Sequence, residues 1–221
     1  MAATAAEILI PTARGPARAH VTLPEGAAPP RAALVLGHGA GGGVGAPDLQ
    51  AARKAALSAG TAVALIEQPY RVAGRRSAPP ATQLDEAWMT VVEHLSTGEL
   101  EGVPVITGGR SSGARVACRT ASPTGAVAVL CLAFPLVPPM RAGAARPAAS
   151  RLPELDAVTV PTLVIQGVRD RFGMPPEAAA RNVVAIAGDH GLKADLAAVG
   201  EAVTRWLPAV LRPVRRGAAR G

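Results

Sequence analysis

A serine stands at the centre of the pattern Gly-Arg-Ser-Ser-Gly at residues 109–113. A serine hydroxyl is a weak nucleophile, so a fold that uses it must expose it beside a base and an anion-stabilising site. A sharp turn from a strand into a helix does this, and it requires glycine two residues before and after the serine. If the pattern were centred on Ser112, the two positions that require glycine would hold Arg110 and Ala114, so this register fails. The pattern therefore predicts Ser111 as the nucleophile of an acyl-transfer reaction.

Two further side chains are candidates for a proton relay with Ser111. His190 follows the last predicted strand, and an imidazole titrates near neutral pH, as a general base requires. Asp170 follows a strand predicted at residues 161–165, where an acid would orient the imidazole and stabilise its charged form. The alternative position for the acid, after the strand ending near Phe134, contains no Asp or Glu. The chain order of serine, acid and histidine predicts a catalytic triad.

Each of these assignments has a plainer alternative. Asp170 has Arg169 and Arg171 beside it as surface ion-pair partners, and a lone histidine is usually structural. Asp189 is expected to cap its own loop or the final helix. The other three histidines fit the role of base less well, because they fall in the opening strands, in a glycine-rich loop and on an exposed helix face: His20, His38 and His94.

The glycine-rich stretch at residues 37–43 follows another apolar strand. Glycines let backbone N–H groups approach an oxyanion closely, so we expect the N–H groups of Ala40 and Ser112 to form an oxyanion hole. A phosphate-binding loop is the competing interpretation, since glycine-rich turns before helices also bind phosphate. Neither a Gly-Lys-Ser/Thr ending nor a dinucleotide pattern with its downstream acid is present. We expect no cofactor and no metal, and a structural role for His38.

Short apolar strands alternate with helices along the chain. The predicted strands cover residues 8–14, 19–24, 32–36, 61–66, 103–107, 126–134, 161–165 and 182–186, and the predicted helices residues 47–58, 82–95, 112–120 and 196–211. Two antiparallel strands followed by this alternation predict an α/β fold with a mostly parallel central sheet and helices on both faces. Ligands bind such sheets beyond the carboxyl ends of the strands, where the candidate triad falls.

We expect residues 1–212 to form a single domain and residues 213–221 to be a disordered basic tail. Residues 137–149 show no periodicity and are interpreted as a reduced surface insertion, leaving a minimal lid. The two cysteines, Cys118 and Cys131, lie in apolar segments and are expected to be buried in a reducing compartment.

The net charge of +7 comes almost wholly from arginines, which are scattered along 221 residues. A polyanion contact is one interpretation, but no basic helix face and no nucleic-acid motif is present, so no nucleic-acid partner is expected. No apolar run reaches the ~18 residues of a membrane span, and no secretion signal is indicated, so we expect no membrane partner and a cytoplasmic location.

Several stretches together resemble a small α/β-hydrolase group related to dienelactone hydrolases. They comprise residues 37–42, 70–79, 84–88, 108–117, 166–170 and 189–190. The group includes testis-expressed hydrolase-like proteins and a subunit of a nuclear acetyltransferase complex. The resemblance covers essentially the whole chain and implies an eight-stranded type of sheet, no cofactor and little lid. Dienelactone hydrolases use a cysteine nucleophile where this chain has Ser111, so dienelactone is not implied as substrate, and some members of the group act as binding proteins.

The sequence therefore predicts a serine hydrolase that acts on a small carboxylic ester or thioester. A non-catalytic interaction module that keeps the hydrolase scaffold is the alternative, although binding alone would not demand a complete triad. Arg71, Arg75 and Arg76 follow a predicted strand end. They are expected either to bind a substrate carboxylate or phosphate, or to pair with acids and water.

Overall fold

A computed structural model describes residues 5–26, 28–140 and 148–211. In these residues eight strands form one sheet in the order β1-β2-β4-β3-β5-β6-β7-β8. They are β1 (Ala5–Ile10), β2 (Ala17–Thr22), β3 (Ala33–Gly37), β4 (Ala62–Glu67), β5 (Val105–Arg110), β6 (Ala128–Leu132), β7 (Thr162–Gly167) and β8 (Arg181–Ile186). β2 pairs antiparallel with β1 and with β4, and every other neighbouring pair is parallel.

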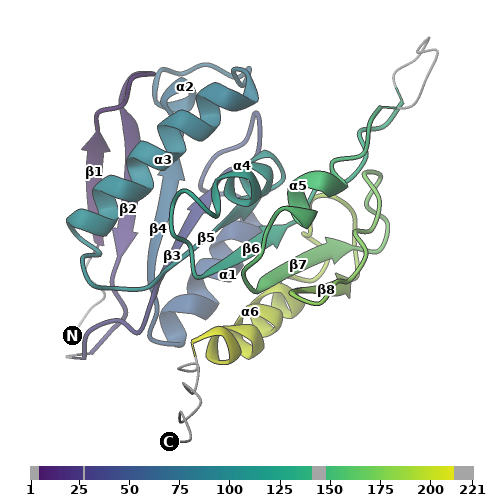
Figure 1. Cartoon of the computed structure of the whole chain (residues 1–221). Helices are drawn as coiled ribbons and strands as arrows, with labels where there is room; N and C mark the ends of the chain where they lie inside the picture. Colours follow the sequence, from purple (N-terminus) through teal and green to yellow (C-terminus); the bar gives the residue numbers. More distant parts are fainter. Residues whose placement is uncertain (1–4, 27, 141–147, 212–221) are drawn as a thin grey trace, which may run out of the picture.

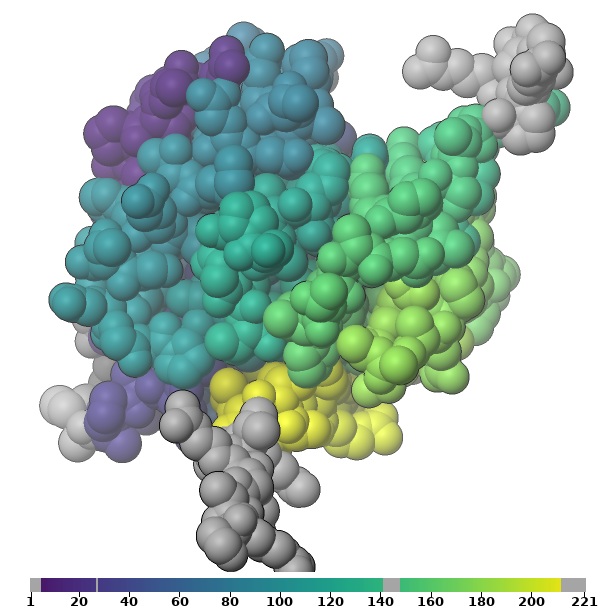
Figure 2. Space-filling view, in the orientation of Figure 1, coloured from purple at the N-terminus to yellow at the C-terminus, as the bar shows by residue number. Residues whose placement is uncertain are grey.

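Helices cover both faces of the sheet. They are α1 (Pro47–Ser58), α2 (Pro69–Val72), α3 (Ala81–Thr97), α4 (Ser112–Thr120), α5 (Leu152–Asp156) and α6 (Leu196–Val210). α3, α4 and α5 lie in front of the sheet in Figure 1, and α1 and α6 lie behind it. In the space-filling view of Figure 2, α3 to α5 cover the near face and α6, in yellow, shows along the lower edge. The predicted α/β architecture, a mostly parallel central sheet with helices on both faces, is confirmed.

The central strands are apolar on both sides because both sides are covered. In β3, Leu34 and Leu36 pack into the core beneath α1 and α6, whereas Ala33 and Val35 pack into the core beneath α3. Trp88 of α3, which is 1% exposed, fills much of the second core. Burial of each large apolar side chain contributes about 1.5–3 kcal/mol, so these cores stabilise the sheet whose strand ends carry the candidate site residues.

The opening hairpin lies earlier in the chain than predicted. The Thr12 hydroxyl donates to the carbonyl of Gly15, and the Gly15 N–H donates to the carbonyl of Thr12. Gly15 has a φ of +98°, which glycine adopts without strain. This turn begins before the Gly-Pro pair on which the prediction was centred, so both strands move toward the N-terminus.

Two short helices were not predicted, and β5 is longer than predicted. α2 and α5 each begin with a proline in the first turn and have four and five residues, too few to show helical periodicity. β5 continues to Arg110 because residues 106–110 all pair with β6. The strand therefore carries two residues of the Gly-Arg-Ser-Ser-Gly pattern, and the turn is confined to Ser111.

Some predictions fall on residues that the structure does not describe. The tail at 213–221 lies outside the described residues, as does part of the insertion at 137–149. The single domain at residues 1–212 stays a prediction. None of the helices in the described ranges combines the length and hydrophobicity needed to cross a bilayer.

Candidate active site

Ser111 occupies a strained turn between β5 and α4. Its backbone has φ 51° and ψ −107°, a conformation that costs a non-glycine residue about 1–3 kcal/mol. A Cβ atom on Gly109 would lie 2.5 Å from the carbonyl oxygen of Gly37, and one on Gly113 would collide with the same oxygen. Both glycines are therefore required by the close approach of β3, as the sequence pattern indicated. The turn lifts the Ser111 hydroxyl beyond the end of the sheet.

The side chains of Ser111, His190 and Asp170 meet in one hydrogen-bonded chain. His190 Nε2 lies 2.9 Å from Ser111 Oγ, and His190 Nδ1 lies 2.8 Å from Asp170 Oδ2. An ionised carboxylate can only accept, so Nδ1 carries the proton and Nε2 is free to accept the Ser111 hydroxyl. The fold thus brings together three residues from three strand ends in the arrangement that a proton relay requires.

The carboxylate of Asp170 is fixed from several directions. Its side chain is fully buried, and its Oδ2 accepts a 2.8 Å hydrogen bond from the Gln166 side chain beside the bond from His190. Its Oδ1 accepts the N–H of Phe172 at 2.9 Å. The alternative of a surface ion pair with a neighbouring arginine does not apply, because Asp170 forms no such pair with Arg169 or Arg171 among the described contacts.

Phe172 is a site residue that sequence reasoning missed. Its ring centroid lies 4.4 Å from that of His190 at a tilt of 44°. The Arg171 guanidinium carbon lies 5.3 Å from the centre of the same ring. An aromatic side chain two residues after the candidate acid was the available clue. Phe172 packs on the imidazole and limits the directions in which it can turn.

The two predicted oxyanion donors are available. Within the described residues, neither the Ala40 N–H nor the Ser112 N–H donates to another protein atom. Ser112 is the first residue of α4, so its N–H lies at the positive end of a helix. A Cβ atom on Gly39 would lie 3.6 Å from Ser111 Cβ, which places the loop carrying Ala40 directly beside Ser111.

His38 is held as a structural group. Its Nδ1 donates to the carbonyl of Gly39 at 2.9 Å, and its Nε2 accepts the N–H of Gln68 at 3.2 Å. Burial lowers the pKa of His38, and the nearby charge of Arg71 lowers it further, although the Gly39 carbonyl acts in the opposite direction. A neutral imidazole with both nitrogens engaged has no base function left for a substrate.

The other two histidines and Asp189 lie away from Ser111 or have structural contacts of their own. His20 lies within 3.4 Å of Glu67, and His94 is exposed on α3. Asp189 accepts the N–H of Gly191 and so caps its own loop, whereas Asp195 caps α6. These contacts leave His190 as the one histidine that the described structure places beside Ser111.

The arginine-rich loop follows β4 and borders the glycine-rich loop. The backbone oxygen of Arg76 lies 3.9 Å from where a Cβ on Gly41 would be. Arg71 is partly buried and donates to the carbonyl of Arg75, whereas Arg75 and Arg76 are exposed. None of the three pairs with an acid among the described residues. They flank the glycine-rich loop, and among the described contacts none of them bonds to Ser111, His190 or Asp170.

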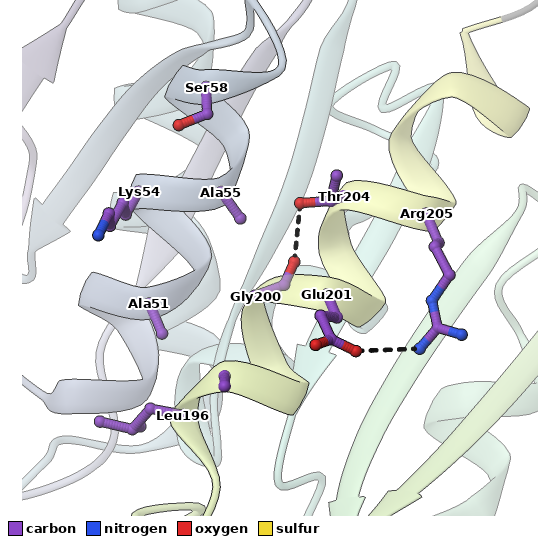
Figure 3. A pocket seen from close by; sticks show the side chains of 10 residues that line it. Ala51, Lys54, Ala55, Ser58, Leu196, Gly200, Glu201, Thr204 and Arg205 are labelled. Carbon is purple, nitrogen blue, oxygen red and sulfur yellow. Dashed lines mark hydrogen bonds and ion pairs between the residues drawn. The ribbon is translucent and has the colours of Figure 1, made fainter.

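A hollow of about 660 Å³ lies elsewhere, between α1 and α6. Figure 3 shows Ala51, Lys54 and Ala55 on one side of it and Gly200 and Thr204 on the other. Small side chains on both helices create it, and no triad residue lines it. Within the described ranges, no group of three or more His, Cys, Asp or Glu side chains is arranged to hold a metal ion.

A family model described as "Alpha/beta hydrolase domain" matches residues 30–200. No curated protein matches the chain.

Solved structures share the fold at low sequence identity. An α/β serine hydrolase without a lid from Xanthomonas campestris is 20% identical, with a TM-score of 0.71 over 94% of this chain and 97% of that one. Est1E from Butyrivibrio proteoclasticus with ferulic acid bound is 16% identical, with a TM-score of 0.75 over 92% and 99%. A dienelactone hydrolase from Anabaena variabilis is 17% identical, with a TM-score of 0.69 over 94% and 98%.

Proposed function

Because the chain belongs to the alpha/beta hydrolase domain family, we propose that it is a serine hydrolase that cleaves small carboxylic esters or thioesters. The observation that carries the proposal is the continuous hydrogen-bonded chain from Ser111 through His190 to Asp170, with separations of 2.9 and 2.8 Å. A protein that only bound a partner would need neither the strained serine nor a buried acid aligned behind a histidine.

In the proposed reaction, the Ser111 hydroxyl attacks the acyl carbon while His190 Nε2 takes its proton. The carbonyl oxygen becomes an oxyanion that the N–H groups of Ala40 and Ser112 stabilise, and each donor is worth roughly 3 kcal/mol in the transition state. His190 then gives the proton to the leaving oxygen or sulfur, which departs and leaves an acyl ester on Ser111. Water, activated by the same histidine, attacks that ester and releases the acid and the free serine.

The position of the arginine-rich loop supports a substrate that carries a negative charge. Arg75 and Arg76 are exposed next to the oxyanion loop and have no acidic partner among the described side chains. A carboxylate or phosphate on the substrate would find charge-assisted donors there. Arg71 contributes by donating to the Arg75 carbonyl, which holds the loop in shape.

An activity-based fluorophosphonate probe tests the proposed nucleophile. The wild type and a Ser122→Ala control, whose serine is exposed two residues beyond the end of α4, should form the adduct, and Ser111→Ala should not. Failure of the wild type to label would favour the non-catalytic interaction module. Labelling of Ser111→Ala would place the nucleophile elsewhere.

A panel of p-nitrophenyl esters and matched thioesters tests the substrate class. Esters of increasing acyl length define the acyl site, and p-nitrophenyl hemisuccinate against p-nitrophenyl butyrate isolates the effect of a carboxylate. We expect Arg75→Gln and Arg76→Gln to raise KM for the hemisuccinate by about tenfold while leaving the butyrate unchanged. Equal effects on both esters would exclude anion recognition by this loop.

We further propose that the protein belongs to the dienelactone-hydrolase-related group that includes the testis-expressed hydrolase-like proteins, with a small acyl compound as its partner and the cytoplasm as its location. Cys118 and Cys131 are buried side by side, with their sulfur atoms 3.5 Å apart, so they pack as small apolar side chains.

A further inference from the structure

Arg110, the residue immediately before the nucleophile, contacts three separate parts of the site. Its Nη2 donates to the backbone carbonyl of His190 at 3.0 Å. Its Nε lies 2.9 Å from Asp48 Oδ2 in the first turn of α1. Its Nη1 lies so close to Gly39 that a Cβ there would be only 2.8 Å away. One guanidinium group therefore touches the segment that carries the base and the segment that carries the oxyanion donor.

The carboxylate of Asp48 has its ion pair with Arg110 and few other contacts. Its side chain is fully buried, its Oδ1 accepts the N–H of Leu49, and its Oδ2 has no hydrogen-bond partner in the described residues besides the ion pair with Arg110. Burial raises the pKa of Asp48, and the charge of Arg110 opposes that shift. A buried carboxylate is costly unless it is paired, and Arg110 is the charged group that pairs with Asp48.

The planar fork of the guanidinium suits this role better than an ammonium group would. It presents donors in fixed directions, one toward Asp48 and another toward the His190 carbonyl. Because α1 is packed into the core beneath the sheet, Asp48 is a rigid anchor, and Arg110 transmits that rigidity to the peptide unit of His190. The imidazole is thus held from its backbone by Arg110 and from its Nδ1 by Asp170.

We propose that Arg110, anchored by Asp48, is a positioning residue that sets the distance of His190 and of the oxyanion loop from Ser111. This inference rests on the proposed serine hydrolase function, because its effect is on the proton transfer in that reaction. Arg110 touches neither the hydroxyl nor the imidazole ring in the described contacts, so it acts through the backbone of His190 and through Gly39.

The test compares kcat and KM for the best p-nitrophenyl ester in Arg110→Lys, Arg110→Ala and the double variant Arg110→Met with Asp48→Asn. Misplacement of a base by about 1 Å costs on the order of 10²-fold in rate, so Arg110→Ala should lose about that factor in kcat with KM changed by no more than about twofold. The lysine should recover part of the loss. The double variant, which leaves no buried charge unpaired, should fold and still lose kcat.

Methylguanidinium in the assay separates positioning from general destabilisation. The Arg110 side chain is 20% exposed, so its site opens to solvent, and the added cation should restore kcat in Arg110→Ala without affecting the wild type. Arg53→Met is the matched control, because Arg53 bonds Thr22 away from the triad and should keep its kcat.

The two proposals fail in different ways. A wild type that the fluorophosphonate does not label overturns the hydrolase function itself. A labelled wild type whose folded double variant keeps kcat within about twofold overturns the role of Arg110 alone. A kcat loss that methylguanidinium leaves unchanged, and that follows the fall in melting temperature, also overturns that role.

Discussion

Gly167, at the end of β7, lies directly against the main chain of Asp189. A Cβ atom at this position would collide with the carbonyl oxygen of Asp189 and would lie 2.7 Å from that of Gly188. The strand end that leads to Asp170 and the loop that carries His190 are therefore in backbone contact. This contact sets the spacing between Asp170 and His190.

Gly167→Ala should therefore impair both stability and catalysis. The collision is with backbone, which cannot rotate away, so we expect the free energy of unfolding to fall by about 1–3 kcal/mol. The displaced loop should lower kcat by on the order of 10²-fold. Urea denaturation and ester hydrolysis measure the two effects. Wild-type kcat in the alanine variant would show that the loop does not depend on this contact.

Gly200→Ala should raise the free energy of unfolding and serves as a control for Gly167→Ala. Gly200 lies inside α6, and its added Cβ would meet Ala55 Cβ at 3.9 Å, an ordinary contact distance. Alanine is favoured over glycine in a helix interior by about 0.5–1 kcal/mol. The free energy of unfolding should rise by that amount, and kcat should stay unchanged. A destabilised Gly200→Ala would mean that α1 and α6 need closer contact than the distance indicates.

Glu154 connects α5 to α4 through two arginines. It accepts from Arg115 at 2.8 Å and from Arg119 at 3.2 Å, and Arg119 also bonds Asp85 of α3. The side chains of this network are about one-fifth exposed, so its ion pairs should be stronger than surface pairs and weaker than fully buried ones. Glu154→Gln should therefore lower the free energy of unfolding by about 1–2 kcal/mol at neutral pH. Glu201→Gln, which removes a 3.9 Å pair on the exposed face of α6, should change it by less than about 0.5 kcal/mol.

The effect of Glu154 should also depend on pH. Burial alone would raise its pKa, but the hydrogen bonds and charges of Arg115 and Arg119 outweigh burial and lower the pKa below 4.5. A carboxyl group with a lowered folded pKa stabilises the fold above its unfolded pKa and loses that effect as pH falls through the folded value. The difference between wild type and Glu154→Gln should shrink from pH 4.5 downward. A constant difference would assign the stabilisation to packing.

His38 should make the free energy of unfolding depend on pH in a higher range than Glu154 does. Its pKa is lowered from 6.5 mainly by burial, so below pH 6.5 the unfolded chain takes up a proton that the folded chain does not. The free energy of unfolding should therefore fall from pH 6.5 down to the folded pKa. In His38→Gln this slope should be absent, and the gap between variant and wild type should be smaller at about pH 5.5 than at about pH 7.5. Parallel stability curves for the two proteins would contradict the neutral, buried state of His38.

The meeting of Ser111, His190 and Asp170 was predictable from the sequence because Ser111 belongs to a short pattern with strict steric demands, and the other two residues follow strands whose carboxyl ends share one edge of the sheet. A Cβ atom on Gly109 would lie 2.7 Å from the carbonyl carbon of Gly113, so part of the glycine requirement is local to the strand-to-helix turn and shows in a short pattern. The strands and long helices were predictable because burial on two faces leaves continuous apolar runs and helical burial leaves periodic ones.

The contacts that tune the site were not predictable in the same way. Arg110 meets Asp48 and the His190 carbonyl across 62 and 80 positions of chain, and no local pattern encodes such a meeting. Phe172 lies over His190 only because β7 and β8 end side by side. These pairings depend on sheet order, which follows from packing of the whole domain.

The central claim is that Ser111 and His190 act as one unit. Groups that act in a single step give losses that do not add, so Ser111→Ala, His190→Ala and the double variant should each lower kcat for the best p-nitrophenyl ester by a similar factor, on the order of 10⁴–10⁶. The comparison uses folded protein confirmed by circular dichroism. Losses that multiply in the double variant, or a kcat that survives either single change, would contradict the account.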